Sequence, residues 1–382
     1  MRVQRTQEPQ TNEVSFEVLD DHDQPVAAVS GFLKYLQARG YSPNTLSAYA
    51  YDLCHFLRFL AHQHLTYQDF TPSRSLALLD HLRTLSTRKA TQQLTPVLAT
   101  TTADGLPARH LAPTTINRIF AAISSFYEYL IVAGQFDHEN PLLKIPDPAL
   151  ARVSERHRPF LGASSRQRPL RRIVRVKTAL RLPRPLTEEQ VAQILASLSS
   201  WRDKALVLLM LQGGLRPGEA LNLHLEDIQY GRRRIFVRYR TDHPRGVRTK
   251  SRTERVVDLH EPEALQALSM YVMHERPSDT DQTLVFLVGG KGKNRNRPLS
   301  YHDLVKLFQR RCERLKIRTP WMTLHALRHT HATRMWEGGM RELALQKRLG
   351  HASPESTRLY TRVSDATVVA EYKRALGEER EP

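Results

Sequence analysis

Just past the middle of the chain stands the stretch Gly214-Leu215-Arg216-Pro217-Gly218-Glu219-Ala220-Leu221. The strongly apolar segment before it, Ala205–Leu211, is followed by Gly213, so a buried helix is expected to stop here. Proline is favoured in the first turn of a helix, and Pro217 therefore predicts a new helix that begins beside Arg216. An arginine at the start of a helix is ordinarily a surface residue. A functional role for Arg216 would have to be indicated by other polar residues of the chain.

Further polar residues stand downstream, at positions where a purely structural helix does not need them. His325 and Arg328 lie three residues apart in one predicted helix, so their side chains share a face. His351 follows a Leu-Gly pair, and Tyr360 comes nine residues later. Lys250 lies in a strongly basic connection between two predicted strands.

This combination of residue types suits the transfer of a phosphodiester group without a metal. The phosphate carries negative charge on its non-bridging oxygens, and two arginine forks can bind both oxygens through bidentate hydrogen bonds. A lysine or a histidine can supply the proton that a leaving alkoxide needs. A tyrosine hydroxyl, with a pKa of about 10, becomes a nucleophile when positive charge or a base lies beside it.

The composition indicates a polyanionic partner. The 382 residues include 57 Lys and Arg against 39 Asp and Glu, a net charge of +18, and nucleic acid is the usual partner of such a chain. No stretch approaches the ~18 uninterrupted apolar residues of a membrane span, and no secretory signal is recognised. Cys54 and Cys312 lie far apart, so neither a disulfide scaffold nor a cysteine metal site is expected. These features favour a cytoplasmic protein.

Charge and periodicity divide the chain into four segments. Residues 1–24 are acidic and show no apolar periodicity, which predicts a disordered tail. Residues 25–150 contain four stretches with apolar residues at helical spacing and predict an all-α helical bundle. Residues 151–184 are rich in arginine and proline and predict a basic interdomain linker along a phosphate backbone, with a solvated charge run as the alternative. Residues 185–382 predict a mixed α/β, mainly helical domain.

Several elements of the last segment can be placed by their apolar residues. Ile235–Val237 and Val256–Leu259 predict the two strands of a hairpin, and Leu284–Val288 predicts a further strand. The glycine- and lysine-rich run Gly289–Lys293 is followed by Asn294 and therefore does not complete a nucleotide-binding loop. We interpret this run as a basic loop that faces a nucleic acid.

Taken together, the motifs resemble those of the tyrosine recombinases, the family of phage and transposon integrases and of XerC/XerD-like enzymes. The order Arg, Lys, His-x-x-Arg, His, Tyr matches over residues 184–365. The matching segments are Gly214–Leu221, Arg248–Arg255, His325–Ala332, Leu349–His351 and Tyr360. The resemblance implies two domains, an N-terminal SAM-like core-binding bundle and a C-terminal catalytic domain, which together clamp duplex DNA.

The resemblance also implies a catalytic site of six residues: Arg216, Lys250, His325, Arg328, His351 and Tyr360. The tyrosine would attack the scissile phosphate and form a 3′-phosphotyrosyl link, while the two arginines would bind the phosphate. The lysine would protonate the leaving 5′ oxygen. The first histidine would assist proton transfer involving the tyrosine, and the second would hydrogen-bond the phosphate. Glu219 and Asp227 are candidates for orienting the arginines, with pairing to any other nearby basic residue as the alternative.

By the same resemblance, the chain would be a site-specific DNA recombinase that works through a Holliday junction, without ATP, metal or other cofactor. Its partner would be double-stranded DNA that carries specific recombination sites, and a homotetramer would assemble on it. Val368, Val369, Tyr372 and Leu376 lie at helical spacing. The spacing alone is equally compatible with a helix that packs on its own domain, and by the resemblance a C-terminal helix of this kind would dock on the neighbouring protomer.

Other functions share some of these features. A type IB topoisomerase would use similar chemistry on one duplex as a monomer, and a DNA-binding regulator would keep the fold without catalysis. A metal-dependent nuclease would need a ligand cluster. His325, His329 and His331 have no Glu or Cys partner at a suitable spacing, and Arg328 would place a positive charge among them. His329 and His331 are therefore interpreted as structural residues, and no metal is expected.

Overall fold

The chain divides between residues 180 and 181 into two compact units, which are treated one at a time. The computed structural model describes residues 1–7, 14–85, 110–142, 144–146, 170–178, 184–249, 251, 253–351 and 357. The predicted fold class is confirmed, because the first unit is mainly a helical bundle and the second combines helices with a small sheet. Within the described residues, no helix is both long enough and apolar enough to cross a membrane.

The described residues of the first unit form four α-helices, as predicted. They are α1 (Ala27–Ala38), α2 (Pro43–His62), α3 (Arg74–Thr84) and α4 (Pro113–Val132), with the 3₁₀ helix η1 (Tyr67–Asp69) before α3. Ser42 begins α2, since its hydroxyl accepts a hydrogen bond from the backbone N–H of Thr45 at 3.2 Å. The apolar stripes of the helices meet in one core, where the rings of Phe32 and Phe126 lie edge to face with centroids 5.6 Å apart.

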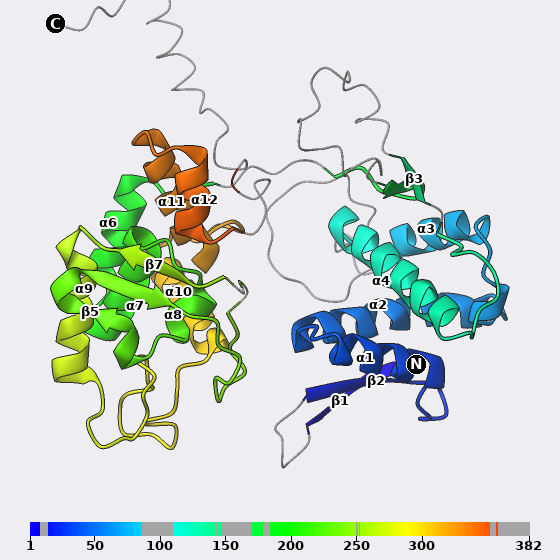
Figure 1. Cartoon of the computed structure of the whole chain (residues 1–382), viewed down its shortest axis with the longest axis horizontal. Helices are drawn as coiled ribbons and strands as arrows, with labels where there is room; N and C mark the ends of the chain where they lie inside the picture. The colour runs from blue at the N-terminus through cyan, green and yellow to red at the C-terminus, as the bar shows by residue number, and fades with distance from the viewer. Residues whose placement is uncertain are drawn as a thin grey trace, which may run out of the picture. The chain divides into compact units, whose positions relative to one another are not determined.

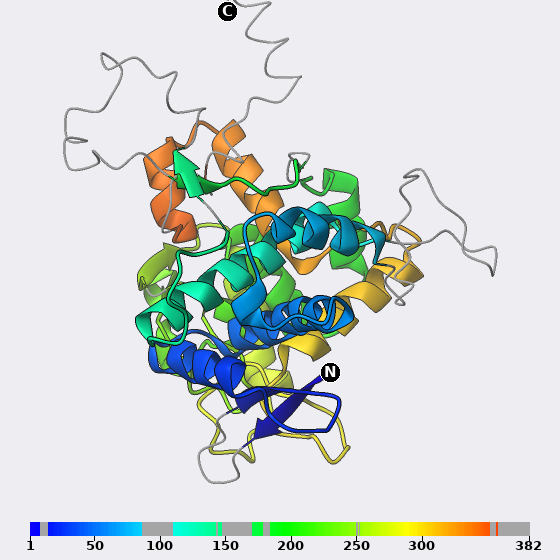
Figure 2. The same cartoon turned by 90° about the vertical axis from the view of Figure 1, so that its right-hand side faces the viewer.

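A β-hairpin precedes these helices. Strand β1 (Arg2–Gln7) pairs antiparallel with β2 (Val14–Leu19), and the hairpin packs against α1 and α2 (Figure 1, Figure 2). Val18 is completely buried in the core of this unit. The prediction of a disordered acidic tail over residues 1–24 was therefore wrong for the residues described there. In β2 apolar and polar residues alternate, which is the pattern of a half-buried strand, and the net acidic charge obscured it.

Part of the predicted linker also belongs to the first unit. Strand β3 (Lys144–Pro146) pairs antiparallel with β4 (Leu170–Arg172). Val176 is buried in the core, and the side-chain amide of Asn117 on α4 exchanges two hydrogen bonds of 2.9 Å with its backbone N–H and carbonyl. The prediction of a linker over 151–184 was thus wrong for residues 170–178. The side-chain amide of Asn117 takes the place of a neighbouring strand, and no local sequence pattern predicts such a contact.

The second unit begins with a capped helix and centres on a buried one. Its helices are α6 (Glu188–Ser197), α7 (Trp201–Gln212), α8 (Pro217–Leu221), α9 (Pro262–Met270), α10 (Tyr301–Arg314), α11 (Leu324–Glu337) and α12 (Glu342–Leu349), with the 3₁₀ helices η4 (Leu225–Asp227) and η5 (Tyr230–Arg232) and the π-helix η6 (Tyr271–Glu275). Every residue of Ala205–Leu211 in α7 is buried, as its continuous apolar sequence predicts. This helix packs against α9 and α11.

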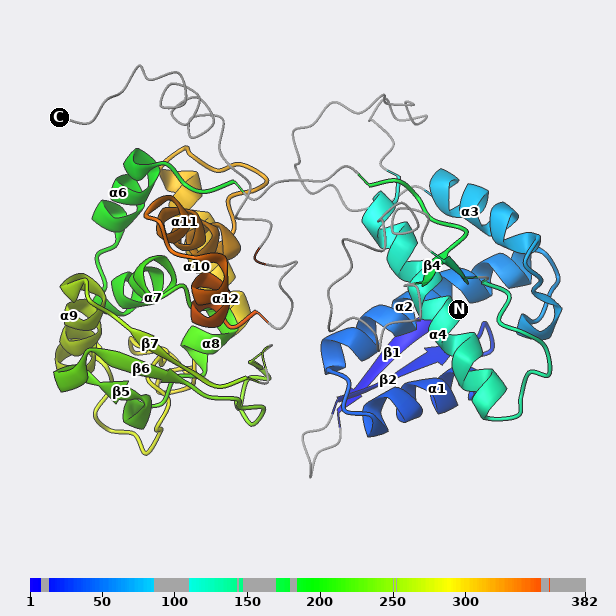
Figure 3. The ribbon, with the colours of Figure 1, turned by 45° about the horizontal axis from the view of Figure 1, so that its top comes forward.

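A three-stranded sheet flanks these helices. Strands β5 (Ile228–Gln229), β6 (Arg234–Val237) and β7 (Arg255–Asp258) lie side by side in that order, with α8 and α12 next to them (Figure 3). The predicted β6–β7 hairpin is confirmed, with Ile235 opposite Val257. In β7 alternate residues, Arg255 and Val257, point into the protein.

The strand predicted over Leu284–Val288 was wrong. This buried segment makes only isolated bridges, one between His224 and Leu284 and one between Leu287 and Pro298. Its carbonyl groups are bound by the Arg276 guanidinium, which donates to the carbonyls of residues 284 and 285 at 3.0 and 3.2 Å. A side chain here provides the hydrogen bonds that a neighbouring strand would otherwise provide.

Candidate functional site

A sharp turn between α7 and α8 sets the position of Arg216. Gly214 has a φ of +63°, and a Cβ atom there would lie 2.5 Å from the ring of His331, so this turn requires glycine. Pro217 opens α8, and the backbone N–H of Arg216 donates to Glu219 Oε2 at 2.8 Å. The guanidinium group is consequently held at the start of α8, beside a carboxylate of the same helix.

Glu219 is a buried carboxylate surrounded by three guanidinium groups. Its Oε1 accepts hydrogen bonds from Arg216 Nη1 at 2.7 Å and from Arg255 Nη1 at 3.0 Å. Its Oε2 accepts from Arg255 Nη2 at 2.7 Å and lies 3.7 Å from Arg328 Nη1. Burial alone would raise the pKa of Glu219, but hydrogen bonds and charge from Arg255, with the charges of Arg328 and Arg216, lower it to about 2. One negative charge thus faces three positive charges, which leaves the cluster cationic.

The same three guanidinium groups bind the end of α12, whose last carbonyls have no partner inside the helix. The contacts are Arg255 Nε to the carbonyl of Arg348 at 2.8 Å, Arg328 Nη2 to that of Leu349 at 2.6 Å, and Arg216 Nη2 to that of Gly350 at 3.1 Å. Gly350 ends the helix with a φ of +62°, and a Cβ there would lie 2.8 Å from Arg255 Nη1. The glycine therefore lets three arginines converge on one helix end.

His351 follows this helix end and joins the cluster. Its Nδ1 lies 2.9 Å from the hydroxyl of the buried Thr357, which fixes the orientation of the ring. Burial, followed by the positive charges of Arg328, Arg216 and Arg255, lowers the pKa of His351 to about 3. At neutral pH this imidazole is uncharged, so it can hydrogen-bond an anion without adding to the charge of the site.

His331 is a structural residue, as predicted. It is buried on α11, with Nδ1 2.8 Å from the carbonyl of Leu211, and its Nε2 accepts a hydrogen bond from Arg348 Nε at 3.0 Å. Burial, with a smaller effect of the Arg348 charge, lowers the pKa of His331 to about 3, so its Nε2 acts as an acceptor. The ring connects α7, α11 and α12, the helices that carry or flank the arginine cluster.

His325 lies on the exposed side of α11, one helical turn before Arg328. Its ring centroid is 6.4 Å from that of His329, whose pKa burial lowers to about 4, with smaller contributions from the charges of His325 and Arg328. Among the described residues, no group of three or more His, Cys, Asp or Glu is placed to hold a metal ion.

The structure brings together three of the six predicted site residues, Arg216, Arg328 and His351, around Glu219. His325 lies one helical turn before Arg328 on α11, but it is exposed whereas Arg328 is buried. Lys250, Tyr360 and the predicted C-terminal helix lie outside the described residues. The second candidate carboxylate, Asp227, binds other arginines, Arg238 and Arg240.

The sequence interpretation missed Arg255. This arginine stands on the inward face of β7, where the alternation of the strand predicts an apolar residue. An arginine at a buried strand position requires a carboxylate partner, because an unpaired charge is costly to bury. That rule indicates that Arg255 needs a carboxylate partner, which the structure shows to be the equally buried Glu219 of α8.

Glu219→Gln should lower the free energy of unfolding by about 3–5 kcal/mol, because three buried or half-buried guanidinium groups lose the carboxylate that they share. Thermal and urea unfolding of the purified chain measure this loss. Glu188→Gln is a matched control, since Glu188 binds Arg334 on an exposed surface, and it should cost less than about 1 kcal/mol. Equal stability of the two variants would show that Glu219 does not hold the cluster together.

Two family models match the chain. The model of the phage integrase family covers residues 184–367, and the model of the phage integrase N-terminal SAM-like domain covers residues 29–134. The first range contains every residue of the arginine cluster, and the second spans α1 to α4 apart from the first two residues of α1.

Curated relatives resemble the chain over most of its length. Transposase A from transposon Tn554 of Staphylococcus aureus is 28% identical over 385 aligned residues, which cover 98% of both chains. Tyrosine recombinase XerC of Caldanaerobacter subterraneus subsp. tengcongensis is 27% identical, over 88% of this chain and 82% of its own.

Solved structures share the fold. The Tn1549 transposon integrase in complex with a circular intermediate DNA superposes with a TM-score of 0.58 at 19% identity, covering 91% of this chain and 99% of that one. The XerH site-specific recombinase bound to a palindromic difH substrate gives a TM-score of 0.58 at 18% identity, covering 92% and 85%.

Proposed function

This chain belongs to the phage integrase family, the tyrosine recombinases, and we propose that the arginine cluster around Glu219 is its catalytic centre for cutting and rejoining DNA. Members of the family are DNA strand transferases, and the chain is accordingly an enzyme of site-specific DNA recombination. The observation that carries the assignment is the convergence of Arg216, Arg328 and His351 on one ionised, buried carboxylate.

The charge of the cluster suits a phosphate that is being transferred. Three guanidinium groups against one carboxylate leave positive charge that a phosphate oxygen can neutralise. Arg216 uses two side-chain N–H donors for Glu219 and Gly350, and its other three have no partner among the described residues. Each hydrogen-bond donor that points at the charge developing on the phosphate typically lowers the activation free energy by about 3–4 kcal/mol.

In the proposed reaction the phenolic oxygen of Tyr360 attacks the scissile phosphorus. A bond forms between phosphorus and this oxygen, the bond to the 5′ oxygen breaks, and Lys250 gives that oxygen a proton. His325 assists transfer of the tyrosine proton, and His351 donates a hydrogen bond to the phosphate as a neutral imidazole. The 3′-phosphotyrosyl link keeps the free energy of the phosphodiester, so attack by a 5′-hydroxyl can rejoin strands without ATP.

The solved relatives support DNA as the partner, because the structures of the Tn1549 integrase and of XerH contain DNA. We further propose that four copies assemble on paired recombination sites through the C-terminal helix, on the bacterial nucleoid. The comparisons give no support to the topoisomerase alternative.

Strand exchange in the presence of EDTA tests this function. Two duplexes of different length, both carrying the borders of the DNA element that encodes the chain, should yield recombinant products, and chelation should leave the yield unchanged. Loss of cleavage under chelation would indicate a metal-dependent nuclease. Relaxation of supercoiled DNA without exchange would indicate a topoisomerase, and binding without cleavage would indicate a regulator.

A further inference from the structure

The three guanidinium groups around Glu219 contact it unequally. Arg255 binds both carboxylate oxygens, at 3.0 and 2.7 Å, whereas the side chain of Arg216 binds one oxygen through Nη1 at 2.7 Å. Arg328 Nη1 lies 3.7 Å from Oε2, beyond hydrogen-bond distance, and donates to the carbonyl of Gly214. The strong bidentate contact therefore belongs to the arginine that the sequence motifs did not assign to the phosphate.

Arg255 is fully engaged inside the protein. All three nitrogens of its guanidinium group have a partner, because Nε donates to the carbonyl of Arg348 at 2.8 Å. Its side chain is only 5% exposed, against 18% for that of Arg216, which keeps three donors without a partner in the described part of the chain. Any effect of Arg255 on a bound phosphate must consequently pass through its neighbours.

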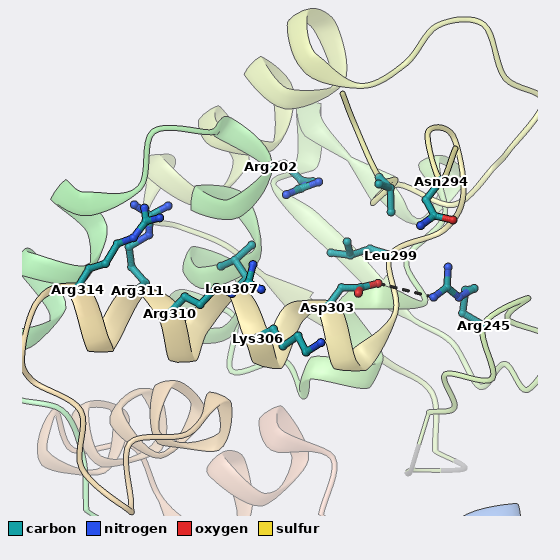
Figure 4. Close-up of a pocket in the computed structure, with 11 residues that line it drawn as sticks. Arg202, Arg245, Asn294, Leu299, Asp303, Lys306, Leu307, Arg310, Arg311 and Arg314 are labelled. Atoms are coloured by element: carbon teal, nitrogen blue, oxygen red, sulfur yellow. Dashed lines mark ion pairs between the residues drawn. The ribbon is translucent and has the colours of Figure 1, made fainter. Parts of the chain in front are cut away.

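Two other arginine–carboxylate pairs of the second unit lie at its surface and show the difference. Arg245 lies 3.9 Å from Asp303 on α10, the contact that Figure 4 marks with a dashed line, and Arg234 lies 2.6 Å from Asp258. Both pairs are partly exposed, so water can take the place of a lost partner. Water has no such access to the carboxylate of Glu219, which is completely buried.

A buried carboxylate that loses its bidentate partner has to draw on other donors, because an unpaired buried charge is costly. Burial raises the pKa of Glu219, and the hydrogen bonds and charge of Arg255 are the largest of the effects that lower it to about 2. Without Arg255, the nearest replacements are the guanidinium groups of Arg216 and Arg328. A donor that turns to Glu219 is lost to the phosphate.

We propose that Arg255 is a positioning residue for DNA cleavage: its bidentate contact occupies Glu219 and leaves the remaining donors of Arg216 to the scissile phosphate. The proposal rests on the proposed function, which assigns this phosphate to Arg216. Arg255 stands five residues after Lys250, and its contact with the Arg348 carbonyl joins β7 to the end of α12. The strand that follows the proposed general acid thus also holds the arginine cluster in place.

Single-turnover cleavage by Arg255→Met at saturating DNA tests the proposal. Methionine replaces much of the arginine stem but cannot bind a carboxylate, so Glu219 should take up donors of Arg216. Cleavage should slow on the order of 10- to 100-fold. The affinity for DNA should change little, because the Arg255 side chain is buried. A normal cleavage rate in the folded variant would overturn the proposal.

The double variant Arg255→Met/Glu219→Gln separates positioning from support of the fold. A neutral glutamine does not compete for Arg216, so the double variant should cleave at least about fivefold faster than Arg255→Met alone. If Arg255 only stabilised the fold, a second change in the buried cluster would leave cleavage equally slow or slow it further. That result would overturn the proposal.

Arg255→Lys keeps the test decisive if Arg255→Met does not fold. The ammonium group of lysine is a point charge that can bind one oxygen of Glu219 but cannot reproduce the bidentate contact. Cleavage should therefore fall by roughly 3- to 10-fold, and adding Glu219→Gln should restore part of the rate. Unchanged cleavage by Arg255→Lys would show that the bidentate contact is not needed.

Arg234→Met is the matched control, because Arg234 lies on the neighbouring strand β6 and pairs with the partly exposed Asp258. This variant should cleave at the normal rate, with or without Asp258→Asn. A loss equal to that of Arg255→Met would show that removal of any arginine from the sheet slows cleavage, and would contradict a specific role of Arg255.

A crystal structure of Arg255→Met reads the contacts without reference to activity. Arg216 or Arg328 should bind the Glu219 oxygens that Arg255 releases. This rearrangement, in a chain whose unmodified form makes no covalent adduct with DNA, would refute the proposed function and leave the contact role of Arg255 standing. An adduct from the unmodified chain, together with unchanged contacts of Arg216 and Arg328 in Arg255→Met, would refute the positioning role alone.

Discussion

Tyr360→Phe should form no covalent protein–DNA adduct on a duplex that carries the recombination site and a nick beside the cleavage position. The nick lets the short 5′-hydroxyl strand diffuse away, so the unmodified chain accumulates as an SDS-resistant adduct. Phenylalanine has no oxygen to attack phosphorus, and removal of a nucleophile costs on the order of 10⁴- to 10⁶-fold in rate. Denaturing gel electrophoresis measures the adduct.

Tyr230→Phe is the control for this prediction, since Tyr230 is an exposed tyrosine of the second unit in η5. This variant should form the adduct as fast as the unmodified chain. An adduct that persists in Tyr360→Phe would assign the nucleophile to another residue.

Arg216→Lys should cleave about 10²- to 10³-fold more slowly in single turnover while its affinity for DNA changes little. The arginine holds Glu219 and the Gly350 carbonyl and still presents further N–H donors in a rigid fork. A lysine keeps the charge, but its single ammonium group cannot bind the carboxylate, the helix end and a phosphate oxygen together. Long-range attraction to DNA is therefore preserved, and stabilisation of the transition state is lost.

Arg232→Lys is the matched exchange at an exposed arginine in η5 and should cleave at the normal rate. Cleavage by Arg216→Lys within a few-fold of the unmodified chain would contradict the role of Arg216 at the phosphate. A parallel loss of DNA affinity and cleavage would place Arg216 in ground-state binding instead.

The sequence predicted the elements whose signals are local. The apolar run of α7, the glycine before Arg216 and the β6–β7 hairpin all depend on neighbouring residues, and all occur in the structure. The helix that carries both His325 and Arg328 was predicted in the same way and is α11. These features place the start of α8 and the polar face of α11 without any knowledge of tertiary contacts.

The features that the sequence did not predict depend on distant partners. The Asn117 amide that binds Val176, and the Arg276 guanidinium that binds the carbonyls at 284 and 285, each replace a strand partner. Trp321 is 45% exposed, and the Arg184 guanidinium lies 4.4 Å from its ring centroid. Such pairings have no periodic signature, so they become visible only in the folded chain.

The candidate site also combines features that local sequence predicts with contacts between residues distant in the sequence. The motifs and their resemblance to the tyrosine recombinases pointed to the arginines and histidines, but not to the contact between Glu219 and Arg255, which are 36 residues apart. Neither residue alone indicates this contact. Only the convergence of α8, β7 and the end of α12 explains why one carboxylate serves three guanidinium groups.

Identification of the residue linked to DNA tests the central claim most directly. The adduct formed on the nicked duplex, in buffer with EDTA, is digested with protease and nuclease, and the nucleotide-bearing peptide is sequenced by mass spectrometry. We predict a peptide that carries a 3′-linked nucleotide on Tyr360. Attachment at any other residue, or broken strands released with no peptide attached, would contradict the account.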